Sequence, residues 1–161
     1  MSEMEPIRVA LVDDQELFRA EVAVVVGAQP DLEVVGQAAD GRDGLAVIAR
    51  TRPDVVLMDV RMPRMGGVEA TRELFSSDGR AGPRPRVVLL TTFELDQAAA
   101  EAIRLGASGS CSRTPPLSCS ARRSGRSTAA ARLSRVGWPR CSTWAWPGPP
   151  RRPRRAGPSP P

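Results

Sequence analysis

The sequence predicts a doubly wound α/β domain, in which a parallel β-sheet carries helices on both faces. Short apolar runs rich in Val, Ile and Leu alternate along residues 7–110 with stretches of helical character, and this order is typical of βα repeats. Right-handed crossovers then place helices on both faces of the sheet. Two of the runs end in carboxylates, since residues 7–12 lead into Asp13 and Asp14 and residues 55–58 lead into Asp59.

The apolar runs predict the strands, at residues 7–12, 31–38, 54–58 and 87–90, with a fifth strand opening at 106–109. Helices are expected over residues 15–26, 40–50, 68–75 and 94–105. Asp14 stands where it can cap the first helix, and Gly27 follows its end. The first helix rests on helical spacing of Leu17, Ala20, Glu21, Val24 and Val25, and the second is expected to bury Leu45, Ala46, Ile48 and Ala49.

Charge divides the chain into two parts. All 18 acidic residues and 12 of the 23 Arg lie in residues 1–110, which carry a net charge of −6, whereas residues 111–161 carry +11. Such asymmetry predicts a domain followed by a tail. We therefore expect one domain over residues 1–110 and an Arg/Pro/Ser-rich, disordered tail over residues 111–161.

The N-terminal residues are acidic and lack an apolar core, so they do not resemble a signal peptide. The sequence has no apolar run long enough to span a membrane. The three Cys residues all follow residue 110 and lack metal-ligand spacing, and the chain has no His. A cytoplasmic protein is the default expectation.

The carboxylates that follow the two apolar runs predict a metal site. In open parallel sheets the functional crevice lies beyond the carboxyl ends of the strands, so Asp13, Asp14 and Asp59 converge if their strands are neighbours. Two carboxylates ~4 Å apart repel by roughly 4 kcal/mol at an effective dielectric constant of ~20. Oxygen ligands that leave room for water and phosphate suit Mg²⁺, which indicates metal-assisted phosphoryl chemistry.

Simpler interpretations exist for each residue taken alone. Asp14 could be only a helix N-cap, Asp59 could begin a loop, and Thr91 could be an ordinary β-branched strand residue. Their joint occurrence favours a functional site.

Several motifs over residues 7–109 resemble the receiver domain of bacterial two-component response regulators, most closely the LuxR/NarL-type subfamily. They are V-D-D-Q-E-L-F-R, V-V-G-Q-A-A-D-G, P-D-V-V-L-M-D-V-R-M-P-R-M-G-G-V-E-A-T, L-L-T-T-F-E-L-D and R-L-G-A-S-G. The resemblance implies a flavodoxin-like (CheY-like) parallel sheet with strand order 2-1-3-4-5. It also implies phosphorelay signalling from a sensor histidine kinase, with transcription controlled through a DNA-binding output domain.

The resemblance implies a role for each matched residue. Asp59 is the phosphoacceptor, and Asp13, Asp14, Asp59 and the backbone carbonyl of Arg61 hold Mg²⁺. Thr91 bonds the phosphoryl group and so shifts an equilibrium around the fourth helix, whose face is a candidate homodimer surface. A receiver of this kind is a phosphoacceptor with self-phosphorylation and self-dephosphorylation only, rather than an enzyme.

The resemblance ends at Gly109. The family continues with an aromatic residue, two apolar residues and Lys-Asp, whereas residues 110–116 read S-C-S-R-T-P-P. The codons TCC TGC TCA AGG ACG CCC encode S-C-S-R-T-P, and with one T in front the same string encodes F-L-L-K-D-A. We therefore hypothesise a one-base frameshift after Gly109, which resequencing of the locus would test.

Three expectations follow from the altered end. The fifth strand and fifth helix become doubtful, so strand four is at risk of becoming an exposed edge. Arg113 stands where the family has an active-site Lys, but a planar guanidinium is not equivalent to an ammonium, so the role is not carried over. The output domain is missing, and no helix-turn-helix pattern remains for specific DNA binding.

Three alternatives stay open beside this interpretation, and the first is a truncated regulator without function. The basic tail could bind nucleic acid non-specifically through phosphate contacts, and a small phosphatase could use the same scaffold. The chain lacks the second acid after Asp59 that a haloacid-dehalogenase-type phosphatase needs.

Overall fold

The structure is a computed structural model and describes residues 5–76, 84–92, 97–113 and 119–121. Among these residues the sheet has the strand order β2-β1-β3-β4-β5-β6. The first five strands are parallel, and β6 pairs with β5 in antiparallel orientation. The strands are β1 (Ile7–Val12), β2 (Leu32–Ala38), β3 (Val55–Asp59), β4 (Arg86–Thr91), β5 (Gly109–Ser112) and β6 (Cys119–Ala121). The predicted order 2-1-3-4-5 is confirmed.

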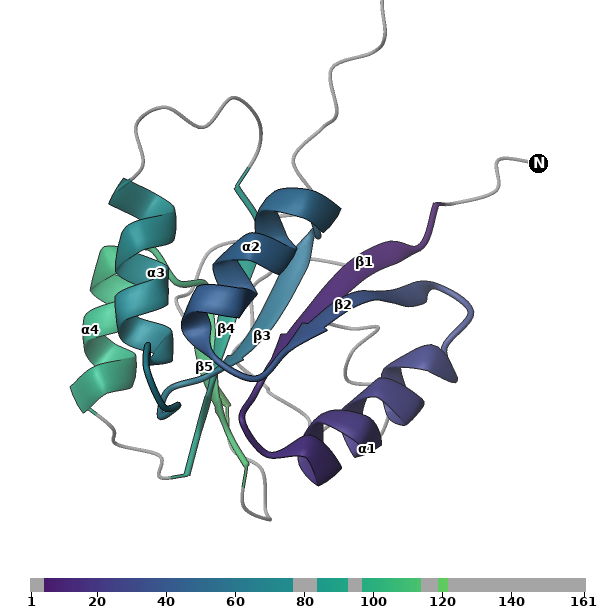
Figure 1. The fold of residues 1–161 in the computed structure, drawn as a ribbon, viewed down its shortest axis with the longest axis horizontal. Coiled ribbons are helices and arrows are strands. Elements are labelled where there is room, and N and C mark those ends of the chain that lie inside the picture. Colours follow the sequence, from purple (N-terminus) through teal and green to yellow (C-terminus); the bar gives the residue numbers. More distant parts are fainter. Residues whose placement is uncertain (1–4, 77–83, 93–96, 114–118, 122–161) are drawn as a thin grey trace, which may run out of the picture.

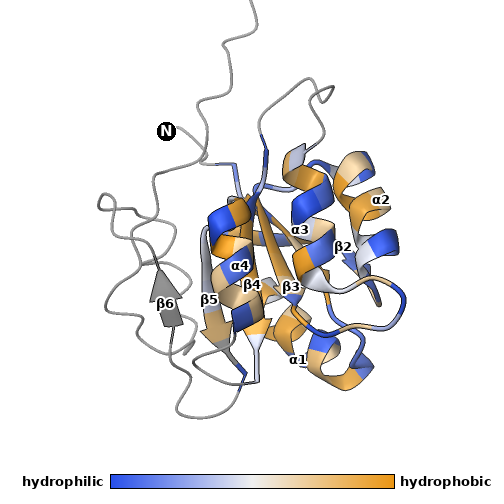
Figure 2. Ribbon diagram, turned by 90° about the vertical axis from the view of Figure 1, so that its left-hand side faces the viewer, coloured by the Kyte–Doolittle hydropathy of each residue, from blue (hydrophilic) through white to orange (hydrophobic). Residues whose placement is uncertain are grey.

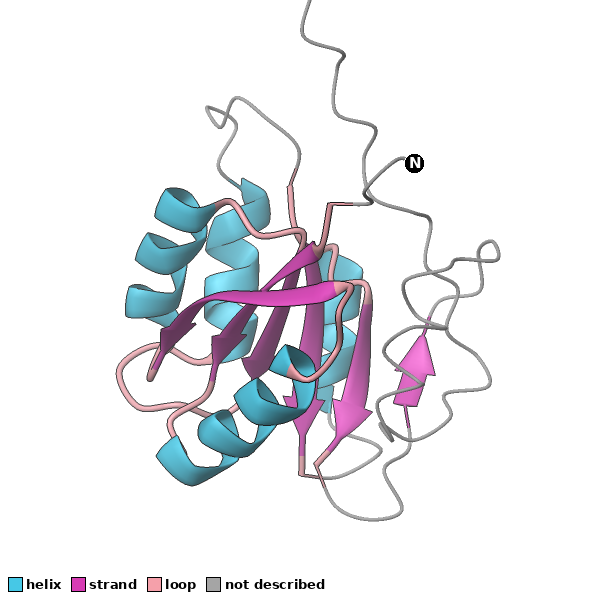
Figure 3. Ribbon diagram, turned by 90° about the vertical axis from the view of Figure 1, so that its right-hand side faces the viewer, coloured by secondary structure: helices cyan, strands magenta, loops and turns pink. Residues whose placement is uncertain are grey.

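Helices cover both faces of this sheet, as the sequence predicted. One face carries α1, and the opposite face carries the other helices of the described part of the chain (Figures 1 and 3). The helices are α1 (Glu16–Gly27), α2 (Gly41–Thr51), α3 (Gly67–Ser76) and α4 (Gln97–Leu105). None of the described helices is long and apolar enough to cross a membrane.

The central strands are apolar on both faces because each face is buried under helices. Figure 2 shows this pattern, with apolar strands in the interior and hydrophilic residues along the helices. Alternate residues of β1 enter different cores, since Leu11 packs in the α1 core and Val12 packs in the core beneath α2, α3 and α4. Val26 of α1 completes the first core, and Leu74 of α3 completes the second.

The start of α1 differs from the prediction. Asp14 does not cap this helix, whose N-cap residue is Gln15 and makes no side-chain capping bond. Asp13 instead stabilises the turn before α1, because its Oδ1 accepts a hydrogen bond of 2.8 Å from the Gln15 backbone amide. An Asp can cap a helix only from the N-cap position, and Asp14 lies one residue before that position.

The inward faces of α1 and α2 also differ from the sequence interpretation. Leu17 and Val24 are 82% and 72% exposed, whereas Val22 and Val26 are buried. In α2, Ala46 and Ala49 are exposed, and Val47 is buried beside Ile48. Both segments have apolar residues on more than one side, so periodicity alone did not identify the side that meets the sheet. The start of α2 is nevertheless well defined, because Asp40 Oδ1 accepts a hydrogen bond from the Asp43 amide at 2.9 Å.

The fifth strand, which the altered end of the family pattern made doubtful, is present. Residues Gly109–Ser112 pair with Val88–Thr91 of β4, so β4 is not an edge of the sheet. Backbone hydrogen bonding does not require large apolar side chains, and Cys111, which is disulfide-bonded, is only 2% exposed. The predicted fifth-helix region and the remainder of the tail lie outside the described residues, apart from the short β6.

Truncation of a core leucine should destabilise the domain much more than truncation of the exposed one. Leu74 is 1% exposed and Leu17 is 82% exposed. We expect Leu74→Ala to lower the free energy of unfolding by about 2–5 kcal/mol and Leu17→Ala to change it by at most about 0.5 kcal/mol. Urea denaturation of both variants measures the difference, and equal losses would contradict the observed orientation of α1.

Candidate functional site

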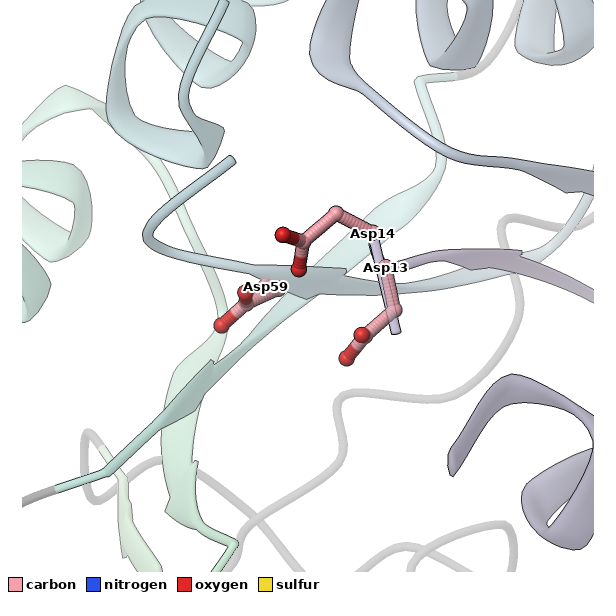
Figure 4. A group of neighbouring side chains, drawn as sticks. All are labelled: Asp13, Asp14 and Asp59. Carbon is pink, nitrogen blue, oxygen red and sulfur yellow. The ribbon is translucent and has the colours of Figure 1, made fainter. Parts of the chain in front are cut away.

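The ends of β1 and β3 bring three acidic side chains together. Val12 pairs with Met58, so the residues that follow them, Asp13 and Asp59, reach the same level at the edge of the sheet. Asp14 comes next along the chain, and ligand oxygens of all three carboxylates lie within 4.8 Å of one another (Figure 4). Asp13 is 2% exposed and Asp59 is 5% exposed, whereas Asp14 is exposed. The predicted convergence is therefore present.

The other predicted site residues lie on the neighbouring segments. Thr91 is the last residue of β4 and is 3% exposed. Asp59 pairs with Leu90, so Thr91 lies one residue beyond the level of Asp59 on the adjacent strand. Arg61 lies in the exposed loop after β3, and its backbone amide donates a hydrogen bond to the Asp59 carboxylate.

A close backbone contact fixes the position of Asp59. A Cβ atom on Gly67 would lie 2.2 Å from the Asp59 carbonyl oxygen, so only glycine allows α3 to begin this close to β3. The Gly67 amide also donates a hydrogen bond of 3.0 Å to the carbonyl of Val60. These two contacts hold the start of α3 against the end of β3, next to Asp59.

The far end of the same loop is attached to α2. Arg64 adopts a left-handed backbone conformation with φ of 65°. Its guanidinium contacts the buried carboxylate of Asp40 and also lies 3.3 Å from Asp43 Oδ2. The hydrogen bond from the Asp43 amide, together with Arg64, holds the pKa of Asp40 below its usual value. Arg64 therefore stabilises the loop that carries Arg61.

Arg113 is the site residue that sequence reasoning did not assign. Its Nη1 lies 3.2 Å from Asp13 Oδ2 and 3.4 Å from Asp59 Oδ2. Its Nη2 donates a hydrogen bond of 2.8 Å to Gln15 Oε1, and its backbone amide donates one of 2.7 Å to the Thr91 carbonyl. The signal was the position of a basic residue just beyond the fifth strand, and the structure places its charge in the cluster.

The electrostatics of the cluster favour an additional cation. Burial, followed by the neighbouring charge of Asp13, raises the pKa of Asp59 to about 6, although Arg113 opposes the shift. Burial also raises the pKa of Asp13, against the lowering effects of the Gln15 amide and Arg113. Asp13 Oδ2 is buried and accepts no hydrogen bond from the described residues. An oxygen-only site with an unsatisfied buried carboxylate oxygen fits a hard divalent cation such as Mg²⁺.

Asp59→Asn should stabilise the metal-free protein at pH 8. The folded-state pKa of Asp59 lies at about 6, above its ordinary value of 3.8, so ionisation of this group opposes folding above pH 6. The neutral amide removes this cost of about 1–3 kcal/mol. The advantage should shrink as the pH falls from 6 towards 4, where the wild-type carboxyl becomes protonated in the folded state. Thermal melts across this pH range in a chelator measure it, and a pH-independent difference would contradict the assignment.

Comparison with known proteins identifies the family. The family model described as response regulator receiver domain matches residues 9–114. The transcriptional regulatory protein YxjL of Bacillus subtilis (strain 168), itself uncharacterised, is 47% identical over 105 residues, which are 65% of this chain and 46% of that protein. The DNA-binding transcriptional activator DevR/DosR of Mycobacterium tuberculosis is 40% identical over 103 residues, covering 64% of this chain and 46% of the activator.

A solved structure gives the same result. The two-component response regulator of the LuxR family from Aurantimonas sp. SI85-9A1 superposes with a TM-score of 0.61 and 32% sequence identity, covering 68% of this chain and 76% of that one. This chain spans about half the length of the curated relatives it matches. From its parallel sheet, its acidic cluster and these relatives, the chain belongs to the receiver domain family of two-component response regulators of the LuxR/NarL type.

Proposed function

We propose that Asp59 accepts a phosphoryl group from a sensor histidine kinase in a Mg²⁺-dependent reaction. A receiver domain acts in phosphorelay signalling, and the observation that carries the proposal is the convergence of Asp13, Asp14 and Asp59. Asp59 lies at the rim of the sheet, where a carboxylate can meet a reactant that approaches from outside.

The metal would be held by Asp13, Asp14, Asp59 and the backbone carbonyl of Arg61. When bound, Mg²⁺ supplies positive charge that offsets the repulsion between the attacking carboxylate and the phosphoryl oxygens. Support comes from the buried oxygen of Asp13 that lacks a hydrogen bond and from the raised pKa of Asp59.

The side chains of the site have separate tasks. A carboxylate oxygen of Asp59 forms a bond to phosphorus as the bond from phosphorus to the kinase histidine nitrogen breaks. Gly67 holds the Asp59 backbone against α3, which keeps the nucleophile in place. The Thr91 hydroxyl would then donate a hydrogen bond to a phosphoryl oxygen, which biases the β4–α4 region towards one conformation.

The proposal extends to partners. The sensor kinase is the phosphodonor, and a homodimer could form through the face of α4. The matched segment covers 46% of each of the two relatives that are transcriptional regulators, so control of transcription through a DNA-binding output domain is part of the proposal. The domain would act in the cytoplasm as a phosphoacceptor that only phosphorylates and dephosphorylates itself.

The hypothesis of a nucleic-acid-binding tail rests on the net charge of +11 over residues 111–161. Most of that segment lies outside the described residues, so the hypothesis stays a prediction. Salt-sensitive binding that persists in a fragment of residues 111–161 would support it.

Incubation of the chain with a small phosphodonor such as acetyl phosphate tests the proposed function. We expect one phosphoryl group per chain in the presence of Mg²⁺, loss of labelling in a chelator, and loss of labelling in Asp59→Asn. Intact-protein mass spectrometry measures the added mass, and release of the phosphoryl group by neutral hydroxylamine, which cleaves an acyl phosphate but not a phosphate ester, identifies the linkage.

Asp54→Asn is the matched control. Asp54 precedes β3 at the opposite end of the same strand, where its Oδ2 accepts a hydrogen bond of 2.9 Å from the Arg8 amide. The change is chemically identical to Asp59→Asn but lies far from the cluster, so labelling should persist. Labelling of Asp59→Asn at the wild-type level would refute the assignment of the phosphoacceptor.

A further inference from the structure

We propose that Phe18, in the first turn of α1, and Gln15, the N-cap residue of α1, hold the guanidinium of Arg113 in the acidic cluster, where it competes with the divalent cation for Asp13 and Asp59. The inference rests on the metal site of the proposed function. In this arrangement Arg113 is the resident cation of the metal-free site, and Phe18 and Gln15 are positioning residues that set how readily a metal replaces it.

The guanidinium is held on several sides. Its Cζ atom lies 4.1 Å from the centroid of the Phe18 ring, a distance at which the ring quadrupole attracts the cation. Nη2 is bound to Gln15, and Nη1 faces both Asp13 and Asp59. The side chain of Arg113 is 12% exposed, so these contacts are screened only partly by water.

The same contacts explain why the Arg113 guanidinium would compete with a metal ion for the carboxylates. Asp13 Oδ2 and Asp59 Oδ2, the oxygens that Nη1 approaches, belong to two of the three carboxylates whose oxygens cluster within 4.8 Å. A divalent ion among these oxygens would lie close to the guanidinium and be repelled by it. Nη1 makes ion pairs without a hydrogen bond to Asp13 Oδ2, so this oxygen remains available to a stronger cation.

The Phe18 ring can hold Arg113 because of the shape of the guanidinium group. A planar guanidinium stacks on an aromatic face and presents several donors at once, whereas an ammonium is a compact point charge. Phe18 packs partly buried against the core beneath α1 and so is itself fixed. The first turn of α1 therefore acts on the metal site through Arg113, although it supplies no proposed metal ligand.

Affinity of the full chain for Mn²⁺, measured from the electron paramagnetic resonance signal of the free ion, tests this inference without any phosphoryl transfer. We expect Arg113→Gln to bind Mn²⁺ about tenfold more tightly than wild type or better, because a nearby positive charge is removed. Phe18→Leu should bind it about three- to tenfold more tightly, which corresponds to the loss of a cation–π contact. The double variant should match Arg113→Gln alone, since Phe18 acts through Arg113.

Three further variants separate positioning from general disturbance of the fold. Phe18→Tyr retains the aromatic face and should keep the wild-type Mn²⁺ affinity within about twofold. Leu17→Ala alters the adjacent, exposed residue of the same turn and should also leave the affinity unchanged. Gln15→Ala changes an exposed residue, so it should fold even if Phe18→Leu does not, and we expect about two- to threefold tighter binding from the lost hydrogen bond.

Equal or weaker Mn²⁺ binding by Arg113→Gln would overturn the inference. A gain from Phe18→Leu that persists undiminished in the Arg113→Gln background would also overturn it, because Phe18 would then act independently of Arg113. Absence of Mn²⁺ binding in every variant would overturn both this inference and the metal site of the proposed function. Failure of phosphoryl labelling alongside the expected order of affinities would refute only the proposed function.

Discussion

Repulsion between two buried carboxylates is the interaction on which the site depends. Asp13 and Asp59 are almost fully buried at the ends of adjacent strands, and burial disfavours their ionised forms. The fold does not relieve this cost by separating them, since the strand register and the close packing of Gly67 hold both groups in place. Positive charge must therefore come from elsewhere, either from Arg113 or from a bound metal. Arg113 and a bound metal would both contact the carboxylates of Asp13 and Asp59, so they would compete for these groups.

The sheet could be predicted from the sequence because its central strands are buried on both faces. Runs such as residues 55–58 contain no polar residue, whereas a strand with one exposed face would alternate apolar and polar residues. The helices were predicted in place but not in orientation. In α1 the segment Val24–Val26 is apolar on every side, so the choice of Val26 over Val24 as the buried residue depends on contact with β2 rather than on periodicity.

The candidate site was predictable where it depends on strand ends and unpredictable where it depends on long-range contact. Asp13, Asp14 and Asp59 converge because parallel strands share one carboxyl edge, and this rule needs no coordinates. The contribution of Arg113 could not be derived in the same way. The segment around it departs from the family pattern after Gly109, which made the fifth strand doubtful although residues 106–109 predicted its start. Pairing of β5 with β4 is what carries the guanidinium to the cluster.

The contact between Gln15 and Arg113 joins residues separated by 98 positions. Closing a loop carries an entropic cost that grows with its length. During synthesis on the ribosome, Asp13 and Asp14 emerge early. Arg113, which pairs with Asp13, emerges only after almost the whole domain has been synthesised. The acidic cluster would thus lack the charge of Arg113 until that residue had been synthesised, and a cation from the surrounding medium could occupy it before then.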